Sequence, residues 1–151
     1  MSFITILGSI VTIILPDSCF TSDILINIHT MWLHCGSFVV SIYLLLSKEV
    51  KINKDNLIRS IIVFLIFIII AQTLNLTIYN SNILNGETFN MFYISPYFIS
   101  SLPVFSVIQE SVPYVIFLLS YILILIASVV IVYSITYSIN KLYKKYLKKN
   151  I

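Results

Sequence analysis

Three long runs without Asp, Glu, Lys or Arg limit what this chain can fold into. They cover about residues 24–46, 60–79 and 113–139, and each has about the 20 apolar residues that a helix needs to cross a bilayer. Only 10% of the residues are charged, whereas a soluble domain carries about 25%. The pattern therefore predicts an all-α fold, a polytopic membrane helix bundle.

A fourth apolar segment, residues 3–15, is shorter and ends at Pro16. It has no basic stretch before it and no small-residue cleavage site after it, which favours a short first span over a signal peptide. We therefore expect about four transmembrane helices in a single bundle over residues 1–151. An outer segment at 80–112 precedes the last span, and a basic tail at 140–151 follows it.

The basic residues predict the orientation. Lys and Arg occur only within residues 47–59 and 140–151, and the positive-inside rule assigns such segments to the cytoplasm. With four spans, both termini are then cytoplasmic, and residues 16–23 and 80–112 lie outside. We predict a multi-pass protein of the cell membrane. The basic, aromatic tail fits a stop-transfer anchor, which we favour, or a contact with anionic lipid.

The polar residues of the second predicted span share one helix face. Intervals of three or four residues separate them; they are Asp23, Asn27, Thr30, His34, Ser37 and Ser41. An ionisable residue inside a membrane is a functional candidate by default. We therefore take His34 as the candidate catalytic residue, a general base, with Asn27 and Ser37 as orienting residues. His29 lies about 140° round the helix and favours a structural interpretation.

The other spans carry weaker patterns of the same kind. In the third span, Gln72, Asn75 and Tyr79 share a face. In the fourth, one side carries small residues suited to close helix contact, namely Ser120, Ala127, Ser134 and Ser138. Polar groups in hydrocarbon need partners. We therefore expect these faces to turn inward around His34 and to enclose a polar hollow that opens toward the outer leaflet.

The outer segment contains the stretch "FNMFYISPYFISSLPVF", residues 89–105, which is apolar, aromatic and uncharged, and is interrupted by Pro96 and Pro103. It is too short and too interrupted to span, so it predicts a re-entrant or interfacial aromatic element between the last two spans. It is either a lid that touches lipid acyl chains or a loop that packs on the bundle. Asn90 joins Asn75 as a candidate that orients the base or the substrate.

Other kinds of site find little support. The chain has no Gly-rich phosphate loop and no metal-ligand spacing, so we expect no metal, no cofactor and no nucleic acid. Cys19 and Cys35 are predicted to be small buried hydrophobic residues. Membrane lipids are the expected partners, together with an N-terminal partner half or a second copy of the chain.

Several motifs follow one another in a familiar order. An intramembrane His-x-Gly at 34–36 precedes a basic loop and an Asn-bearing helix, then "NMFYISPYFISSLPVF" and a "VPY" at 112–114 that opens the last helix. From about Gly8 to Tyr133 the chain resembles the C-terminal half of the YwaF-like family of multi-pass membrane proteins. That family includes a mammalian transmembrane acyltransferase that makes polyunsaturated ether phospholipids.

The resemblance implies a family fold of about seven helices, of which this chain would be the C-terminal part. It also implies acyl transfer, with a cysteine that accepts the acyl group and a histidine that acts as base, which corresponds to His34. The cysteine belongs to a Leu-Pro-Leu-His-Leu-Cys type of motif that nothing here matches, since "LPDSC" at 15–19 differs in spacing. Cys35 cannot replace the missing cysteine of this motif. On a helix it points about 100° away from His34, and a nucleophile must lie within hydrogen-bond reach of its base.

Three functions stay open on the sequence alone. The first is phospholipid acyl transfer with His34 as base. The second is a non-catalytic membrane subunit, or an orphan half-protein that pairs with another chain. The third is a small transporter, which the unbroken apolar run "IIVFLIFIII" at 61–70 disfavours. Whether the chain is an enzyme is therefore undecided at this stage.

Overall fold

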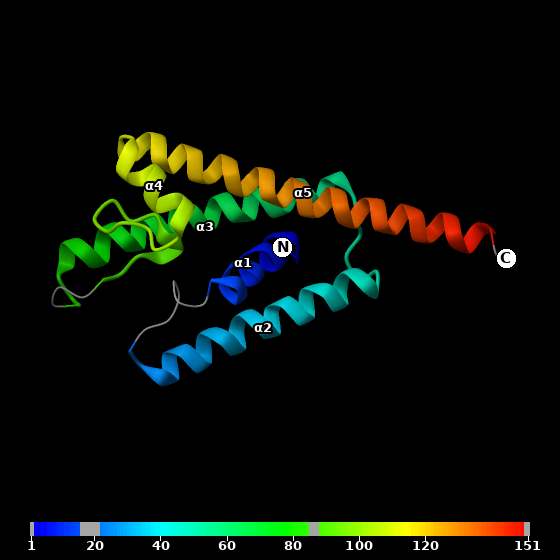
Figure 1. Cartoon of the computed structure of the whole chain (residues 1–151), viewed down its shortest axis with the longest axis horizontal. Helices are drawn as coiled ribbons and strands as arrows, with labels where there is room; N and C mark the ends of the chain where they lie inside the picture. Colours follow the sequence, from blue (N-terminus) through cyan, green and yellow to red (C-terminus); the bar gives the residue numbers. More distant parts are fainter. Residues whose placement is uncertain (1, 16–21, 85–87, 150–151) are drawn as a thin grey trace. The chain divides into compact units, whose positions relative to one another are not determined.

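The computed structural model describes residues 2–15, 22–84 and 88–149, and every regular element within these ranges is a helix (Figure 1). In chain order the elements are α1 (Ser2–Ile14), α2 (Ile24–Leu46), α3 (Lys54–Ser81), the 3-10 turn η2 (Met91–Tyr93), α4 (Pro103–Ser111) and α5 (Tyr114–Lys149). No strand occurs in the described ranges, which confirms the all-α prediction.

Three of these helices are long and apolar enough to cross a membrane, at Ile24–Leu46, Lys54–Ser81 and Tyr114–Tyr143. The fourth apolar helix, α1, has 13 residues and rises about 20 Å, less than the roughly 30 Å of bilayer hydrocarbon. The structure is therefore that of a helical membrane protein whose first helix is short, as predicted.

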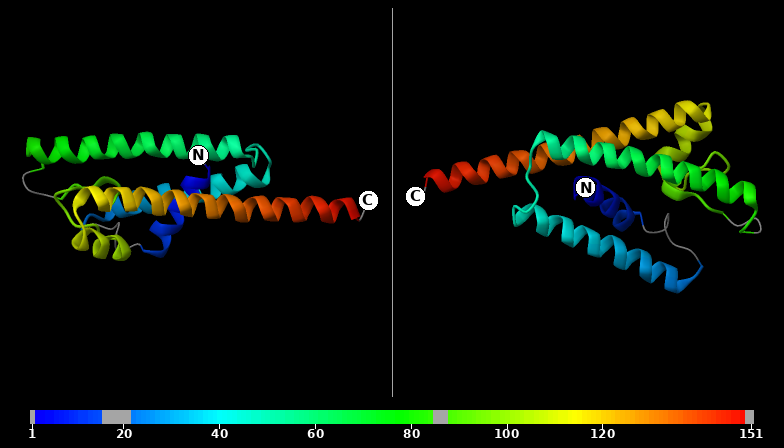
Figure 2. Two further views of the ribbon diagram at one scale, coloured as in Figure 1. Left: turned by 90° about the horizontal axis from the view of Figure 1, so that it is seen from above. Right: turned by 180° about the vertical axis from the view of Figure 1, so that it is seen from behind.

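The helix bounds agree with the predicted spans to different degrees. The second span has the predicted bounds, whereas α3 begins six residues before position 60, at Lys54. Helix α4 lies inside the outer segment and was not predicted from the sequence. The predicted tail continues α5 as one helix to Lys149, as Figure 2 shows.

The chain divides into two compact units. Unit 1 comprises residues 1–62 and 126–151, and unit 2 comprises residues 63–125. Helices α3 and α5 each have one part in unit 1 and the other part in unit 2. A single bundle through the whole chain stays a prediction, and each unit is described below by itself.

The core of unit 1 forms where α1 packs against α2. Phe3, Ile6, Leu45 and Val129 are its buried members, and the Phe3 ring meets the Tyr133 ring edge-on at 5.5 Å between centroids. The buried positions of α1 recur every three or four residues, as expected when one side of a helix packs. Short as it is, α1 is therefore an integral part of the unit 1 core.

Ser9 lies on the buried side of α1 and is only 1% exposed. Within the described ranges its hydroxyl oxygen has no hydrogen-bond partner. A buried, unpaired hydroxyl is destabilising, so we expect Ser9→Ala to raise the free energy of unfolding by about 0.5–1 kcal/mol. Titration with sodium dodecyl sulfate in mixed micelles, followed by circular dichroism, measures this change.

Thr12 provides the matched control for this prediction. It lies on the same side of α1, and its hydroxyl donates to the Gly8 carbonyl at 3.1 Å. Thr12→Val should therefore lower the free energy of unfolding by about 0.5–1 kcal/mol, opposite in sign to Ser9→Ala. A loss of stability in both variants would contradict the prediction for Ser9.

The small-residue side of the last span does not pack as predicted. Of its four predicted members, Ser120 is half-buried, whereas Ala127, Ser134 and Ser138 are exposed at the surface of the chain. The buried residues of α5 are larger, with Phe117 and Tyr121 in unit 2 and Val129 in unit 1. The prediction was wrong because large side chains, which fill space between helices without a close backbone approach, form the contacts of this helix.

Candidate functional site

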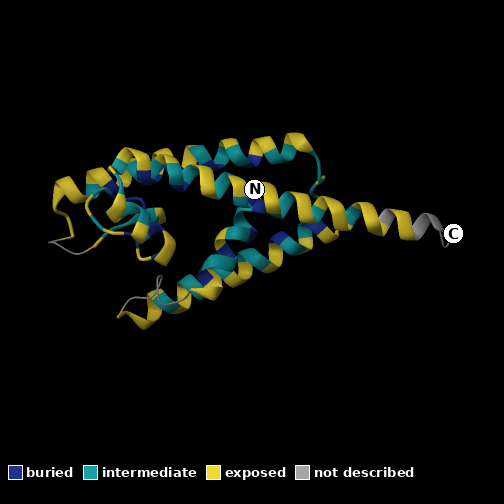
Figure 3. Ribbon diagram, turned by 45° about the horizontal axis from the view of Figure 1, so that its top comes forward, coloured by how far each residue is buried: buried dark blue, intermediate teal, exposed yellow. Residues whose placement is uncertain are grey.

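The polar side of α2 is the less exposed side of that helix. The Asp23 carboxylate caps the helix by accepting from the Leu25 amide at 2.8 Å and the Ile26 amide at 3.4 Å, which fixes where the helix begins. From there Asn27, Thr30, His34 and Ser37 are half-buried and Ser41 is buried, whereas Asp23 itself is exposed. Figure 3 shows exposed and less exposed strips alternating along the helices.

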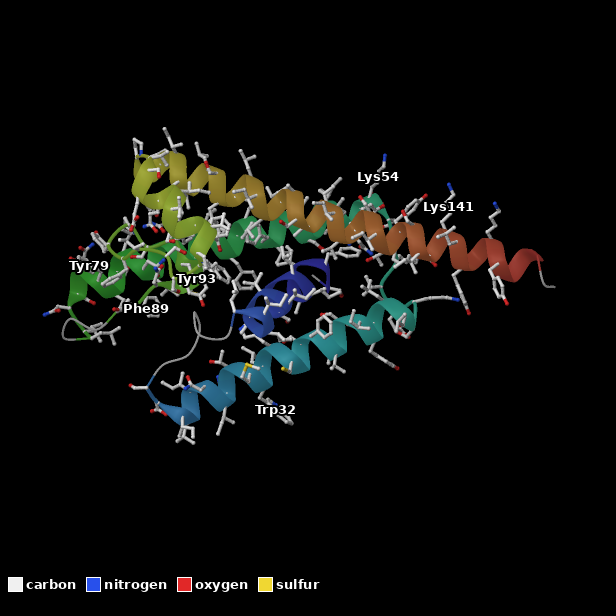
Figure 4. All side chains as sticks on the ribbon, in the orientation of Figure 1. Trp32, Lys54, Tyr79, Phe89, Tyr93 and Lys141 are labelled. Carbon is white, nitrogen blue, oxygen red and sulfur yellow. The ribbon has the colours of Figure 1, made fainter. Side chains whose placement is uncertain are left out.

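The opposite side of α2 is apolar and exposed, with Ile24, Leu25, Ile28, Trp32 and Val39 at the surface of the chain. Trp32 is 81% exposed, and Figure 4 shows its ring pointing away from the helix. Such side chains suit contact with lipid. Because α2 presents its apolar side outward, His34 and its polar neighbours occupy the side that faces the unit.

The two histidines of α2 have different surroundings. His34 is half-buried, and His29 is exposed. Among the predicted site residues, Asn27 and Ser37 lie on the same side of the helix as His34. Imidazole on a half-buried, hydroxyl-bearing surface can exchange a proton with a bound group, whereas His29 faces away from these neighbours.

The hollow that the structure shows on α2 lies next to His34 rather than around it. Its walls are Asn27, Ile28, Met31, Trp32 and Cys35, it measures about 430 Å³, and it is open. His34 is not among its lining residues, and the lining surface is apolar. The predicted polar hollow around His34, between the spans, stays a prediction. The exposed Cys35 also corrects its predicted burial, and Cys19 lies outside the described residues.

In unit 2, Asn75 joins α3 to the outer segment. Its side chain is 0% exposed. The amide nitrogen donates to the Met91 carbonyl at 3.1 Å, and the amide oxygen accepts from the Met91 N–H at 2.7 Å. Asn75 thus satisfies both backbone groups of one residue at the start of η2, which fixes the outer segment to the transmembrane helix.

Asn90 shapes the outer segment from within. Its amide oxygen accepts from the Ser95 N–H at 2.8 Å, and its amide nitrogen donates to the Phe98 carbonyl at 3.5 Å. Asn75 and Asn90 therefore bind neighbouring parts of one segment. Both contacts observed here are structural, and a role in orienting a substrate stays a prediction.

Two further residues hold this segment and were missed from the sequence. The Gln109 amide nitrogen donates to the carbonyls of Ser95 and Phe98, both at 3.1 Å, and its oxygen accepts from the Ser100 N–H at 2.8 Å. The Tyr114 hydroxyl donates to the Ile94 carbonyl at 2.7 Å. A polar residue just after a Pro-rich aromatic stretch was the available signal, but α4, which places Gln109, was not predicted.

Gln72 lies near this network on α3. Its side chain lies close to the Tyr114 hydroxyl, and its amide oxygen is buried and has no partner in the described part of the chain. The aromatic contacts close by are tight, since the rings of Tyr79 and Tyr97 stack with centroids 3.6 Å apart. Phe92 adopts a left-handed backbone with φ of 57°, which is strained for an aromatic residue.

The described residues contain no group of three or more His, Cys, Asp or Glu side chains that could hold a metal ion. The site does carry two sets of functional side chains. These are one imidazole with hydroxyl and amide neighbours in unit 1, and a hydrogen-bonded aromatic segment in unit 2.

Comparison with known proteins gives one match. The family model described as the TMEM164 family matches residues 1–133. No curated protein and no solved structure matches the chain. The match covers α1 to α4 and the larger part of α5, and so it includes every residue of the candidate site.

Proposed function

The chain belongs to the TMEM164 family, and on that premise we propose that this integral membrane protein transfers acyl groups between membrane phospholipids. His34 is the general base. The observation that carries the proposal is the position of His34 on the half-buried polar side of a membrane-spanning helix. Ionisable side chains are costly inside a membrane and are kept there for function. The resemblance of residues 34–36, 90–105 and 112–114 to the YwaF-like family supports the reaction class.

The reaction needs a proton acceptor next to the attacking group. In the proposed step, neutral His34 takes the proton of an acceptor-lipid hydroxyl as that oxygen attacks the carbonyl carbon of the acyl donor. The new ester bond forms, and the bond to the donor's oxygen breaks. The imidazolium then returns the proton to the departing oxygen, so that no net charge is left in the membrane.

Further polar groups would orient the base and the substrate. Asn27 and Ser37 lie on the same side of α2 as His34 and supply amide and hydroxyl groups to hold the imidazole. In unit 2, Asn75 and Asn90 act through the outer segment, which they hold in shape. The uncharged aromatic residues 89–105 suit contact with an acyl chain.

Lipid analysis of cells that express the chain tests the proposal. We expect the wild type to change the acyl composition of at least one phospholipid class and His34→Ala to abolish that change. Loss of a general base typically costs a factor of about 10²–10⁴ in rate. His29→Ala is the matched control, because His29 lies on the same helix but is exposed, and it should behave as the wild type.

The protein level in the membrane must be equal in all three samples. A phospholipid profile that is the same for the wild type and His34→Ala, and different from that of cells without the protein, would exclude His34 as the base. A profile that is the same in all cells, at equal protein level, would remove the acyl-transfer proposal altogether.

Two observations favour a second candidate, a non-catalytic membrane subunit. The amides of Asn75 and Asn90 both bind backbone groups, and the hollow on α2 does not include His34. On this proposal the chain binds a partner half or a second copy of itself. Purification in mild detergent should then yield a stoichiometric complex or a homo-oligomer, and a lone monomer would count against it.

The orientation is also a proposal. The two basic segments support a cytoplasmic location for residues 47–59 and for the C-terminal end of α5. If the short α1 forms a fourth crossing with the three long helices, the N-terminus lies on the same side. The outer segment would then face the opposite side of the membrane, where its aromatic residues suit the lipid interface.

A further inference from the structure

The charges of this chain are strongly separated along the sequence. All nine basic residues fall within 48–59 and 141–149, accompanied by only two acidic residues, Glu49 and Asp55. The other four acidic residues all lie in the segments 16–23 and 80–112. One pair of segments is therefore strongly basic, and the other pair carries acidic residues alone.

Unit 1 brings the two basic segments together. The Lys48 ammonium group lies 6.0 Å from the centre of the Tyr143 ring, within reach of a cation–π contact. Lys48 follows the end of α2, and Tyr143 lies near the end of α5. We call the exposed basic side chains of these segments the basic cluster; they are Lys48, Lys51, Lys54, Arg59, Lys141 and Lys145.

Lys48 occupies a backbone position that suits glycine better than lysine. Its φ is 64°, in the left-handed region that favours glycine after a helix. The turn is fixed by hydrogen bonds from the Lys48 N–H to the Leu45 carbonyl and from the Val50 N–H to the Leu44 carbonyl. A lysine at this position strains the backbone and places a cation beside Tyr143. This cost indicates that the positive charge has a function at this position.

The end of α5 is placed to meet phospholipid headgroups. Its apolar part, Tyr114–Tyr143, has 30 residues and is about 45 Å long, which exceeds the roughly 30 Å of bilayer hydrocarbon. Lys141 and Lys145 therefore emerge one turn apart near the headgroups, beside the exposed Tyr143 and Tyr146. Figure 4 shows Lys54 and Lys141 extending away from their helices.

We propose that the basic cluster is a binding site for anionic phospholipid headgroups. The contact of Lys48 with Tyr143 joins the two basic segments within unit 1, and all six side chains of the cluster are exposed. Anionic lipids are attracted to such a surface with a strength that grows with each basic residue. This site is separate from the proposed acyl transfer, because none of its residues belongs to the polar side of α2.

The test compares two tryptophan positions in the full chain, reconstituted in vesicles with brominated lipids that quench tryptophan fluorescence. The native Trp32 is the single tryptophan of the chain and lies on α2 well away from Lys48. In the double variant Trp32→Phe, Tyr143→Trp, the single tryptophan lies beside the cluster. Quenching by brominated phosphatidylglycerol relative to brominated phosphatidylcholine reports the lipid preference at each position.

We expect a preference for phosphatidylglycerol of at least about fivefold at position 143, decreasing as salt is added, and no preference at position 32. Lys48→Gly and the double variant Lys141→Gln, Lys145→Gln, each added to the chain that carries Tyr143→Trp, should reduce it, and Lys48→Arg should retain it. Lys48→Gly also relieves the strain of the left-handed backbone, so it should not lower the melting temperature. A loss of lipid preference in this variant can then not be explained by unfolding.

Equal preference at both positions would overturn the proposal, and so would a preference at position 143 that survives removal of these charges. If the lysines serve only to orient the chain in the membrane, the two positions should show equal preference. Because no lipid turnover is measured, a negative result would leave the acyl-transfer test with His34→Ala unaffected, and the two proposals fail independently.

Discussion

Asn75→Ala is expected to lower the free energy of unfolding by about 2–4 kcal/mol, because the N–H and the carbonyl of Met91 would each lose their partner, at about 1–3 kcal/mol for each buried group. Asn75 is fully buried and makes both hydrogen bonds itself. The helix would remain, since alanine is the best helix former. What changes is the attachment of the outer segment.

Two measurements check this prediction. Detergent unfolding followed by circular dichroism gives the change in stability, and limited proteolysis reports whether residues 88–102 become accessible. Asn80→Ala is the matched control, because Asn80 lies on the same helix and is exposed, and it should change stability by less than about 0.5 kcal/mol. If the two variants behave alike in both measurements, Asn75 does not anchor the outer segment.

The sequence predicted the helices better than their contacts. The bounds of α2 were correct because the run is bordered by Asp23, whose carboxylate caps the helix, and by the polar residues that follow Leu46. The predicted span from about residue 60 lies within α3, which begins earlier, at Lys54. A search for apolar residues does not detect the polar first turn of this helix. Its first turn is held by polar contacts, such as the Asn53 side chain accepting from the Asn56 N–H at 2.9 Å.

The contacts of the outer segment lie beyond what periodicity can predict. Asn75 and Asn90 were chosen from the sequence as substrate-orienting residues, and in the structure both hold the backbone of the outer segment. The partner of Asn75 is the backbone of Met91, 16 positions away. Every residue has the same backbone groups, so the type of residue at a position does not indicate such a partner. A buried amide beside an irregular, aromatic segment is therefore as much a sign of an anchor as of a ligand site.

The candidate base is a different case. From the spacing of its polar residues, the side of α2 that carries His34 was correctly predicted to be the less exposed side. Residues three or four positions apart lie on the same face of a helix. The hollow around His34 does not follow from this spacing. The shape of a cavity depends on side chains of other elements, so the hollow around His34 stays a prediction. The open surface on α2 lies beside Met31 and Cys35.

The second large effect is expected at the short first helix, where Phe3→Ala should lower the free energy of unfolding by about 2–3 kcal/mol. Phe3 is 1% exposed, and its ring meets the Tyr133 ring edge-on. Truncation leaves a cavity in the core of unit 1. This loss of stability lies at or below the lower end of the range for Phe→Ala in soluble proteins, about 3–5 kcal/mol, because in lipid the lost packing counts while the transfer from water does not.

Ile14→Ala separates this packing effect from a general weakness of α1. Ile14 lies at the end of the same helix and is 67% exposed, so its truncation should change stability by less than about 0.5 kcal/mol. Detergent unfolding of both variants gives the comparison. A 13-residue helix is too short to be held by spanning the bilayer alone, so its place in unit 1 must come from contacts such as that of Phe3. If Phe3→Ala is as stable as Ile14→Ala, some other part of α1 holds it there.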